Sequence, residues 1–294
     1  MSERGEAPPR SGAIGGWASI LPSASVAGLA GVLVVLLLLP LFALLTSVPP
    51  MAILRAAGSP AVEVSLGFTV LASLLALAGS VVFGLPLGYV LARRRFPGRE
   101  VIESIVLLPL VLPHLIAGLA LLMVFGPDAP LGRFLATLGI PVWDTIWGVV
   151  AVMGYVSTSY VVSASMTAFR AVDPEMVGVA RTLGASRGDV FLQITLPLSL
   201  RGILGGMGLS WARSLSEIGG LLVLGYTVYP WPAGANQPVW NPISVLIFET
   251  YQISPAQALA MAALLLLFAL SAFLGMRVLE WALRARGAPR ESRA

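Results

Sequence analysis

Hydrophobic residues in this chain are gathered into six long stretches, and polar residues lie mostly in the segments between them. Each stretch holds roughly the 20 mainly apolar residues that an α-helix needs to cross a bilayer. Backbone polar groups in hydrocarbon must be satisfied within their own segment, so six transmembrane helices are predicted. Their approximate bounds are Val26 to Val48, Leu66 to Leu91, Val101 to Phe125, Ile146 to Phe169, Ile203 to Gly225, and Ala256 to Leu279.

The first stretch follows a polar lead, residues 1–25, but it is too long for the apolar region of a signal peptide. No small-residue cleavage site precedes the return of polar sequence, so it is expected to remain as a helix. The predicted organisation is a tail of residues 1–25, a transmembrane domain of residues 26–280 and a second tail of residues 281–294.

Composition agrees with a lipid surrounding. The chain is 57% hydrophobic and 11% charged, whereas a soluble domain has about 25% charged residues. It contains no cysteine, so disulfides and thiolate metal sites in this chain are excluded. The predicted fold class is an all-α membrane protein, and the net charge of +4 is not taken to indicate a nucleic-acid partner.

The basic residues indicate the orientation. With the N-terminus in the cytoplasm, all eighteen basic residues except Arg55, Arg133 and Arg213 fall in inner segments. The reverse orientation would contradict the known bias of cytoplasmic loops toward basic residues. Both termini are therefore expected in the cytoplasm of a prokaryotic cell, and the inner segments are residues 1–25, 92–100 and 170–202 and the chain from Arg277 onward.

Prolines interrupt several of the predicted spans, at Pro40, Pro86, Pro109 and Pro113. Neighbouring helices can satisfy the carbonyls that a proline leaves free. The prolines therefore indicate either simple kinks or broken helices that line a path.

The inner segment from Asp173 to Leu200 carries helix signals throughout. Asp173 and Pro174 form an N-cap and first-residue pair, and Gly184 can adopt the left-handed conformation that ends a helix. Ser186 with Asp189 resembles a capping box for a second helix, which is expected to end before Pro197. Two short amphipathic helices around a glycine turn are predicted, either to dock on another protein or to cap the bundle.

This segment resembles the cytoplasmic coupling loop of ABC importer permeases, whose pattern is Glu-Ala-Ala, three residues, Gly, nine residues, then Ile-x-Leu-Pro. Gly178 stands at the position of the motif glutamate, and the nearest carboxylate is Glu175, one helical turn earlier. The residues assigned to the coupling loop are Glu175, Gly178, Ala180, Arg181, Gly184, Ala185, Ile194, Leu196 and Pro197.

The resemblance implies a type I importer permease with six helices and a cytoplasmic coupling hairpin. It further implies a dimer of ATPase subunits, a second permease copy and an external substrate-binding protein as partners. The chain has no lysine, so it cannot carry the G-x-x-x-x-G-K-[ST] phosphate loop. ATP and magnesium are expected on the ATPase, and this chain is expected to be neither an enzyme nor a holder of a cofactor.

Arg213 and Glu217 lie inside the fifth predicted span, where a charge costs about 2.5 to 3.5 kcal/mol. At a spacing of four residues they can pair. They are interpreted either as an internal ion pair that fixes packing or, with Ser216, as part of a translocation path. The surrounding glycines are expected to permit close helix approach at a dimer axis: Gly205, Gly206, Gly208, Gly219 and Gly220.

The run from Ala212 to Gly219 is similar to the fifth helix of the molybdate, tungstate and sulfate branch of these permeases, although iron and thiamine permeases carry related sequences. The resemblance implies an oxyanion cargo.

His114 is interpreted as a satisfied interior histidine, and Glu100 and Glu103 as first-turn carboxylates. An intramembrane protease lacks support, because His114 accompanies no nucleophile-elbow pattern. A stand-alone secondary transporter would leave the inner hairpin unexplained.

Overall fold

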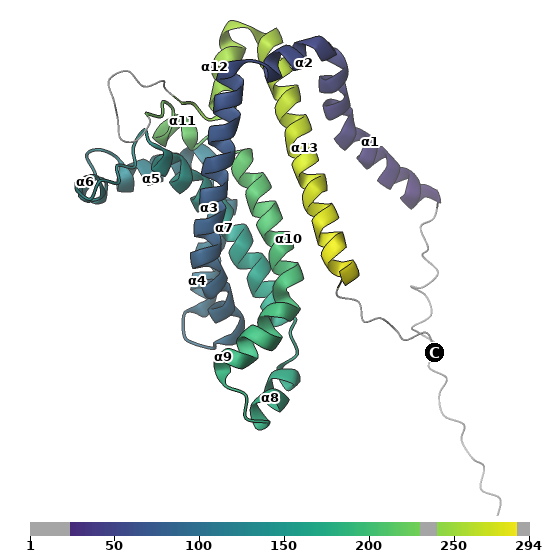
Figure 1. Ribbon diagram of the computed structural model, residues 1–294, viewed down its shortest axis with the longest axis vertical. Helices are drawn as coiled ribbons and strands as arrows, with labels where there is room; N and C mark the ends of the chain where they lie inside the picture. The colour runs from purple at the N-terminus through teal and green to yellow at the C-terminus, as the bar shows by residue number, and fades with distance from the viewer. Residues whose placement is uncertain (1–23, 230–239, 287–294) are drawn as a thin grey trace, which may run out of the picture. The chain divides into compact units, whose positions relative to one another are not determined.

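The computed structural model describes residues 24–229 and 240–286, most of which lie in α-helices (Figure 1). The chain divides after Pro49 into two compact units. The first unit contains α1 (Ala24–Ser47), an almost wholly apolar helix whose side chains are exposed over most of its length. A helix that is apolar on every side suits a surrounding of lipid.

Three long helices form the centre of the second unit, and Figure 1 shows them side by side. They are α3 (Pro60–Arg93), α7 (Ile146–Arg170) and α10 (Leu196–Leu215), and α7 packs along both of the others. Beside them, α13 (Pro255–Arg286) contacts α10 and α12 (Ile243–Ile253). The last helix continues beyond the predicted start of the second tail at residue 281, and the remainder of both predicted tails lies outside the described residues.

Small residues allow these helices to approach closely. A Cβ placed on Gly88 of α3 would collide with Ser165 of α7, and one on Gly206 of α10 would collide with Ala164 of α7. In lipid the attraction between helices comes largely from such close packing. Gly206, Gly208, Gly219 and Gly220 of the fifth predicted span pack against other parts of the same chain, and their expected role at a dimer axis stays a prediction.

Shorter helices connect the long ones. Their bounds, in chain order, are α2 (Pro50–Ala57), α4 (Arg99–Leu107) with a 3₁₀ turn (Leu108–Leu110), α5 (His114–Phe125), α6 (Pro130–Thr137), α8 (Pro174–Thr182), α9 (Arg187–Val190) with a π-helical turn (Phe191–Thr195), and α11 (Leu221–Leu224).

Among the described residues, five helices are long and apolar enough to cross a membrane. A sixth candidate is a bent pair, in which residues 99–110 and 114–125 meet at an angle of 112°. The chain is thus a multi-pass, all-α membrane protein, as predicted.

The third predicted span is not a continuous helix, and its prolines explain the difference. Pro109 lies in the 3₁₀ turn and Pro113 directly precedes α5. A proline lacks the N–H that would continue the helix and restricts the residue before it, so two prolines four residues apart end one helix and allow another to start in a new direction. By contrast, Pro40 and Pro86 lie inside uninterrupted helices.

The fifth predicted span differs from the prediction at both ends. It begins earlier, because the chain is continuously helical from Arg187 to Leu215, and it ends at Leu215 rather than at Gly225. The expected helix end before Pro197 is wrong. The Leu196 N–H bonds to the Phe191 carbonyl in a π turn, and this widened turn carries the helix past a proline that has no N–H to donate.

Candidate functional site

The predicted inner hairpin is formed by α8, a tight turn and α9. The Asp173 carboxylate accepts a hydrogen bond of 2.8 Å from the Glu175 N–H, and Pro174 is the first helical residue. At the other end, Ser186 and Asp189 form a reciprocal capping box at the start of α9. Each cap satisfies backbone N–H groups that have no partner within a first helical turn. The two predicted helix starts are confirmed.

The turn between the two helices depends on Gly184, whose φ is +90°. The Gly184 N–H bonds to the Arg181 carbonyl and the Ala185 N–H to the Ala180 carbonyl, both at 3.1 Å. This pair of bonds is a Schellman motif, which requires a left-handed residue at the position of Gly184. The hairpin is consequently a defined structure and not a flexible linker.

The surface of α8 is open. None of its residues is buried, and an apolar row along it is exposed at 50% for Met176, 62% for Val179 and 83% for Leu183. A Cβ on Gly178 would have no other atom within 4 Å, so the site could hold the glutamate of the family motif without conflict. Exposed apolar side chains beside Glu175 and Arg181 give α8 the character of a docking surface.

The other predicted coupling residues lie where the hairpin joins α10. Ile194 is in the π turn, and Leu196 and Pro197 begin α10. The structure therefore places the nine residues along one connected segment, from α8 through the turn to the first residues of α10.

A charged cluster lies at the opposite end of α10, where that helix stops. The Glu217 side chain is 1% exposed, and both of its oxygens accept hydrogen bonds. Arg213 Nη2 donates to one at 3.0 Å and the Gly220 N–H to the other at 2.9 Å. The predicted pairing of Arg213 with Glu217 is confirmed, but the pair sits at a helix break and not in the middle of a helix.

Arg213 has two further partners. Its Nη1 donates to the Ser216 hydroxyl at 3.0 Å, and its Nη2 lies 2.6 Å from His114 Nε2. Because a guanidinium has only donors, the facing nitrogen of His114 accepts. The Arg213 side chain remains 17% exposed. In this cluster the Glu217 carboxylate is buried, whereas part of the Arg213 guanidinium stays accessible to solvent.

His114 is the residue of this cluster that the sequence interpretation missed. It has polar partners, as predicted, but its side chain is 44% exposed and not interior. Glycines allow the start of α5 to approach the segment after α10. A Cβ added to Gly219 would lie 2.7 Å from His114 Cβ, and a Cβ added to Gly118 would lie 2.7 Å from Gly220 Cα. The sequence signal was the proline immediately before His114, which places the histidine at a helix start.

Two breaks therefore meet at one place. The break in the third predicted span presents the first residue of α5, and the break after α10 presents residues 216–220. Interrupted helices inside a membrane protein are tolerated where they are buried in protein or line a cavity, and transporters place ion and substrate sites at such breaks.

Comparison with known sequences gives matches over most of the chain. The family described as "Binding-protein-dependent transport system inner membrane component" matches residues 84–285. The molybdate/tungstate transport system permease protein WtpB of Thermococcus kodakarensis is 40% identical over 151 residues, which is 51% of this chain and 55% of that relative. A probable molybdenum ABC transporter permease of Haloferax volcanii is 39% identical over 202 residues, covering 69% of this chain and 73% of the relative.

The fold also matches a solved structure. A chain of a bacterial ABC transporter involved in the import of the acidic polysaccharide alginate superposes with a TM-score of 0.63 at 17% identity, over 88% of this chain and 95% of that chain. At this identity the likeness concerns the fold alone, and it confirms the predicted importer-permease architecture.

Proposed function

Because the chain belongs to the family of binding-protein-dependent transport system inner membrane components, we propose that it forms the translocation path of an ABC importer for a tetrahedral oxyanion such as molybdate or tungstate. One observation carries the oxyanion assignment: a partly exposed guanidinium and a half-exposed imidazole stand over a buried carboxylate at the meeting of two helix breaks. Relatives named for molybdate and tungstate transport support the same cargo.

The charge arrangement suits a dianion in transit. A partly exposed Arg213 provides the positive potential that an anion needs in a medium of low dielectric constant. Glu217, buried behind it at 3.0 Å, reduces that potential so that the anion is also released. In a dimer, the second copy would contribute a second partly exposed guanidinium and a second buried carboxylate.

The inner hairpin supplies the link to ATP. The exposed apolar row of α8 and its capped, rigid turn suit insertion into a cleft of a separate ATPase subunit, which would bind ATP and magnesium. The partners in this proposal are a dimer of ATPase subunits, a second copy of the permease and an external binding protein that delivers the cargo.

Orientation follows from the arginines. Reporter fusions after Arg99 or Arg187 should give a cytoplasmic signal, because the segments that contain these residues are rich in arginine. A fusion near Asn236, which lies outside the described residues, should report the exterior. A paired phosphatase and fluorescent-protein readout checks each position, and an exterior signal at either inner position would contradict the orientation.

Uptake assays test the cargo. The chain, purified with its ATPase and reconstituted in vesicles, should import radiolabelled tungstate only when ATP and the external binding protein are both present. Unlabelled molybdate should compete. Uptake of ferric iron or thiamine instead would refute the oxyanion assignment, whereas tungstate uptake without any ATPase would refute the importer class.

A further inference from the structure

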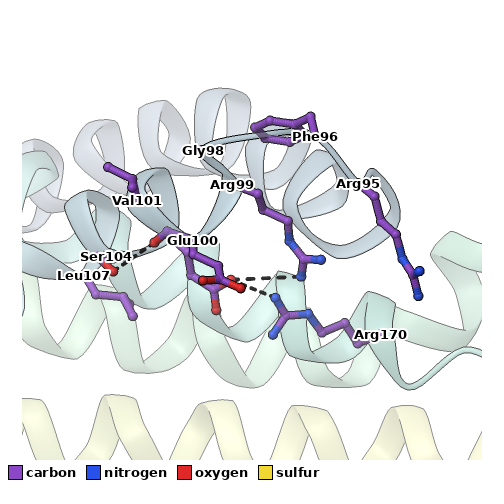
Figure 2. A pocket seen from close by; sticks show the side chains of 10 residues that line it. Arg95, Phe96, Gly98, Arg99, Glu100, Val101, Ser104, Leu107 and Arg170 are labelled. Carbon is purple, nitrogen blue, oxygen red and sulfur yellow. Dashed lines mark hydrogen bonds and ion pairs between the residues drawn. The ribbon is translucent and has the colours of Figure 1, made fainter.

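A basic pocket lies at the hairpin end of the second unit, between the link from α3 to α4 and the end of α7 (Figure 2). Its volume is about 870 Å³. Three arginines from separate places in the chain contribute to its wall: one from the link, one from the start of α4 and one from the end of α7. They are Arg95, Arg99 and Arg170.

Positive charge in this pocket is only partly neutralised. Glu103 accepts from Arg170 at 2.9 Å and lies 4.0 Å from Arg99. Glu100 also lines the pocket, so three guanidinium groups face two carboxylates. The Arg99 Nε is buried without a hydrogen-bond partner among the described residues. Arg95 makes no hydrogen bond or ion pair within the described part of the chain. Donors for a further anion are therefore available.

An apolar row begins at the same pocket. Val101 forms part of the pocket wall and is 61% exposed, and Ile105 and Leu108 continue the row at 60% and 49% exposed. Spacings of four and three residues place these side chains on one face of the helical segment. A molecule with an anionic head and an apolar tail would satisfy both parts of this surface.

We infer that this pocket binds the phosphate headgroup of an anionic phospholipid from the inner leaflet, with an acyl chain along Val101, Ile105 and Leu108. The inference rests on the proposed orientation, which puts the pocket at the inner boundary of the membrane. Basic pockets between transmembrane helices on the cytoplasmic side bind such headgroups. Arginine also matches phosphate geometry, because its guanidinium can donate two parallel hydrogen bonds.

Such a lipid would lie at the root of the hairpin. Arg170 is the last residue of α7, and the Arg93 guanidinium, at the end of α3, donates to the Val172 carbonyl at 3.0 Å just before α8. An occupant held by Arg95, Arg99 and Arg170 would tie the α3–α4 link to the segment from which the hairpin starts.

Native mass spectrometry of the full-length chain in detergent, titrated with phosphatidylglycerol and with phosphatidylcholine, tests the inference. Phosphatidylglycerol should bind more tightly, and Arg95→Gln and Arg99→Gln should each weaken its binding about fivefold. Arg94→Gln is the matched control, since Arg94 is exposed, adjacent in sequence and not part of the pocket wall. It should change binding less than about twofold on the same scale. Arg95→Gln removes no hydrogen bond or ion pair with the described residues, so the melting temperature should not change.

Several outcomes would overturn the inference. Equal binding of the two lipids would show that the headgroup charge is not recognised. An equal loss in Arg94→Gln would indicate general surface charge and not this pocket. If inorganic phosphate or tungstate alone bound there and displaced phosphatidylglycerol at similar concentrations, the site would serve small oxyanions. Binding that disappeared when the chain dimerised would show that a second copy covers α4. Failure of any kind leaves the uptake test of the proposed function unaffected, because lipid binding is measured without transport.

Discussion

Replacing Gly184 with valine is expected to abolish ATP-coupled import while leaving the membrane helices inserted. The φ of Gly184 is +90°, and a β-branched residue held there is strained by about 1 to 3 kcal/mol. At about 2 kcal/mol the ratio of the correct turn to its alternatives would fall roughly thirtyfold. The α8 surface would then point away from its docking position. Uptake in reconstituted vesicles measures import, and ATP hydrolysis is measured on the same complex. Uptake should be lost, whereas ATP hydrolysis should continue.

Gly188→Ala is the matched control for this experiment. Gly188 lies in α9, where an added Cβ would meet only Ser186 Oγ, at 3.8 Å, and its φ is not in the left-handed range. Alanine there should preserve uptake. Normal coupling in Gly184→Val would show that the hairpin merely covers the end of the bundle.

Arg213→Gln is expected to be the most destabilising single change in the charged cluster. It leaves the Glu217 carboxylate 1% exposed, with the Gly220 N–H as the one remaining hydrogen-bond donor among the described residues and His114 Nδ1 3.7 Å away. Breaking a buried ion pair by removing one partner costs about 3 to 5 kcal/mol. Glu217→Gln should cost less, because Arg213 is 17% exposed and keeps Ser216 and His114 as neighbours. The melting temperatures of the purified variants in detergent measure this difference, and that of Arg213→Gln should be the lower.

The double variant Arg213→Gln with Glu217→Gln separates stability from transport. Both charges are then absent, so its melting temperature should lie well above that of Arg213→Gln. Tungstate uptake should nevertheless stay at background, because the positive potential for the anion is gone. Wild-type uptake by a stable double variant would place the path elsewhere, and a double variant no more stable than Arg213→Gln would show that the two side chains are not energetically coupled.

Local sequence signals were sufficient to predict the hairpin. The caps of Asp173 and Ser186 and the left-handed turn at Gly184 depend on residues within a few positions of one another, and the structure contains each of them. The same is true of the Arg213 and Glu217 pair, whose spacing of four residues brings both side chains to one side of a helical turn.

Features that depend on distant parts of the chain were not predictable in this way. His114 reaches Arg213 across 99 positions of sequence because glycines allow two helix breaks to touch. Pro197 was expected to end a helix, but a π turn carries the helix past it. A proline signals a missing N–H, and only the surrounding packing decides whether the chain breaks, as at Pro113, or continues, as at Pro86.

The unbroken helix from Arg187 to Leu215 has a mechanical consequence. It contains 29 residues, which at 1.5 Å per residue is a strut of about 43 Å. Its first turn belongs to the hairpin and its last turn carries Arg213, and a π turn and Pro197, but no loop, lie between them. A displacement of the hairpin that the π turn does not absorb would therefore move the guanidinium in the same event. Engagement of the ATPase and rearrangement of the charged cluster would then form one concerted step, and an intermediate with the hairpin displaced and the cluster at rest would not accumulate.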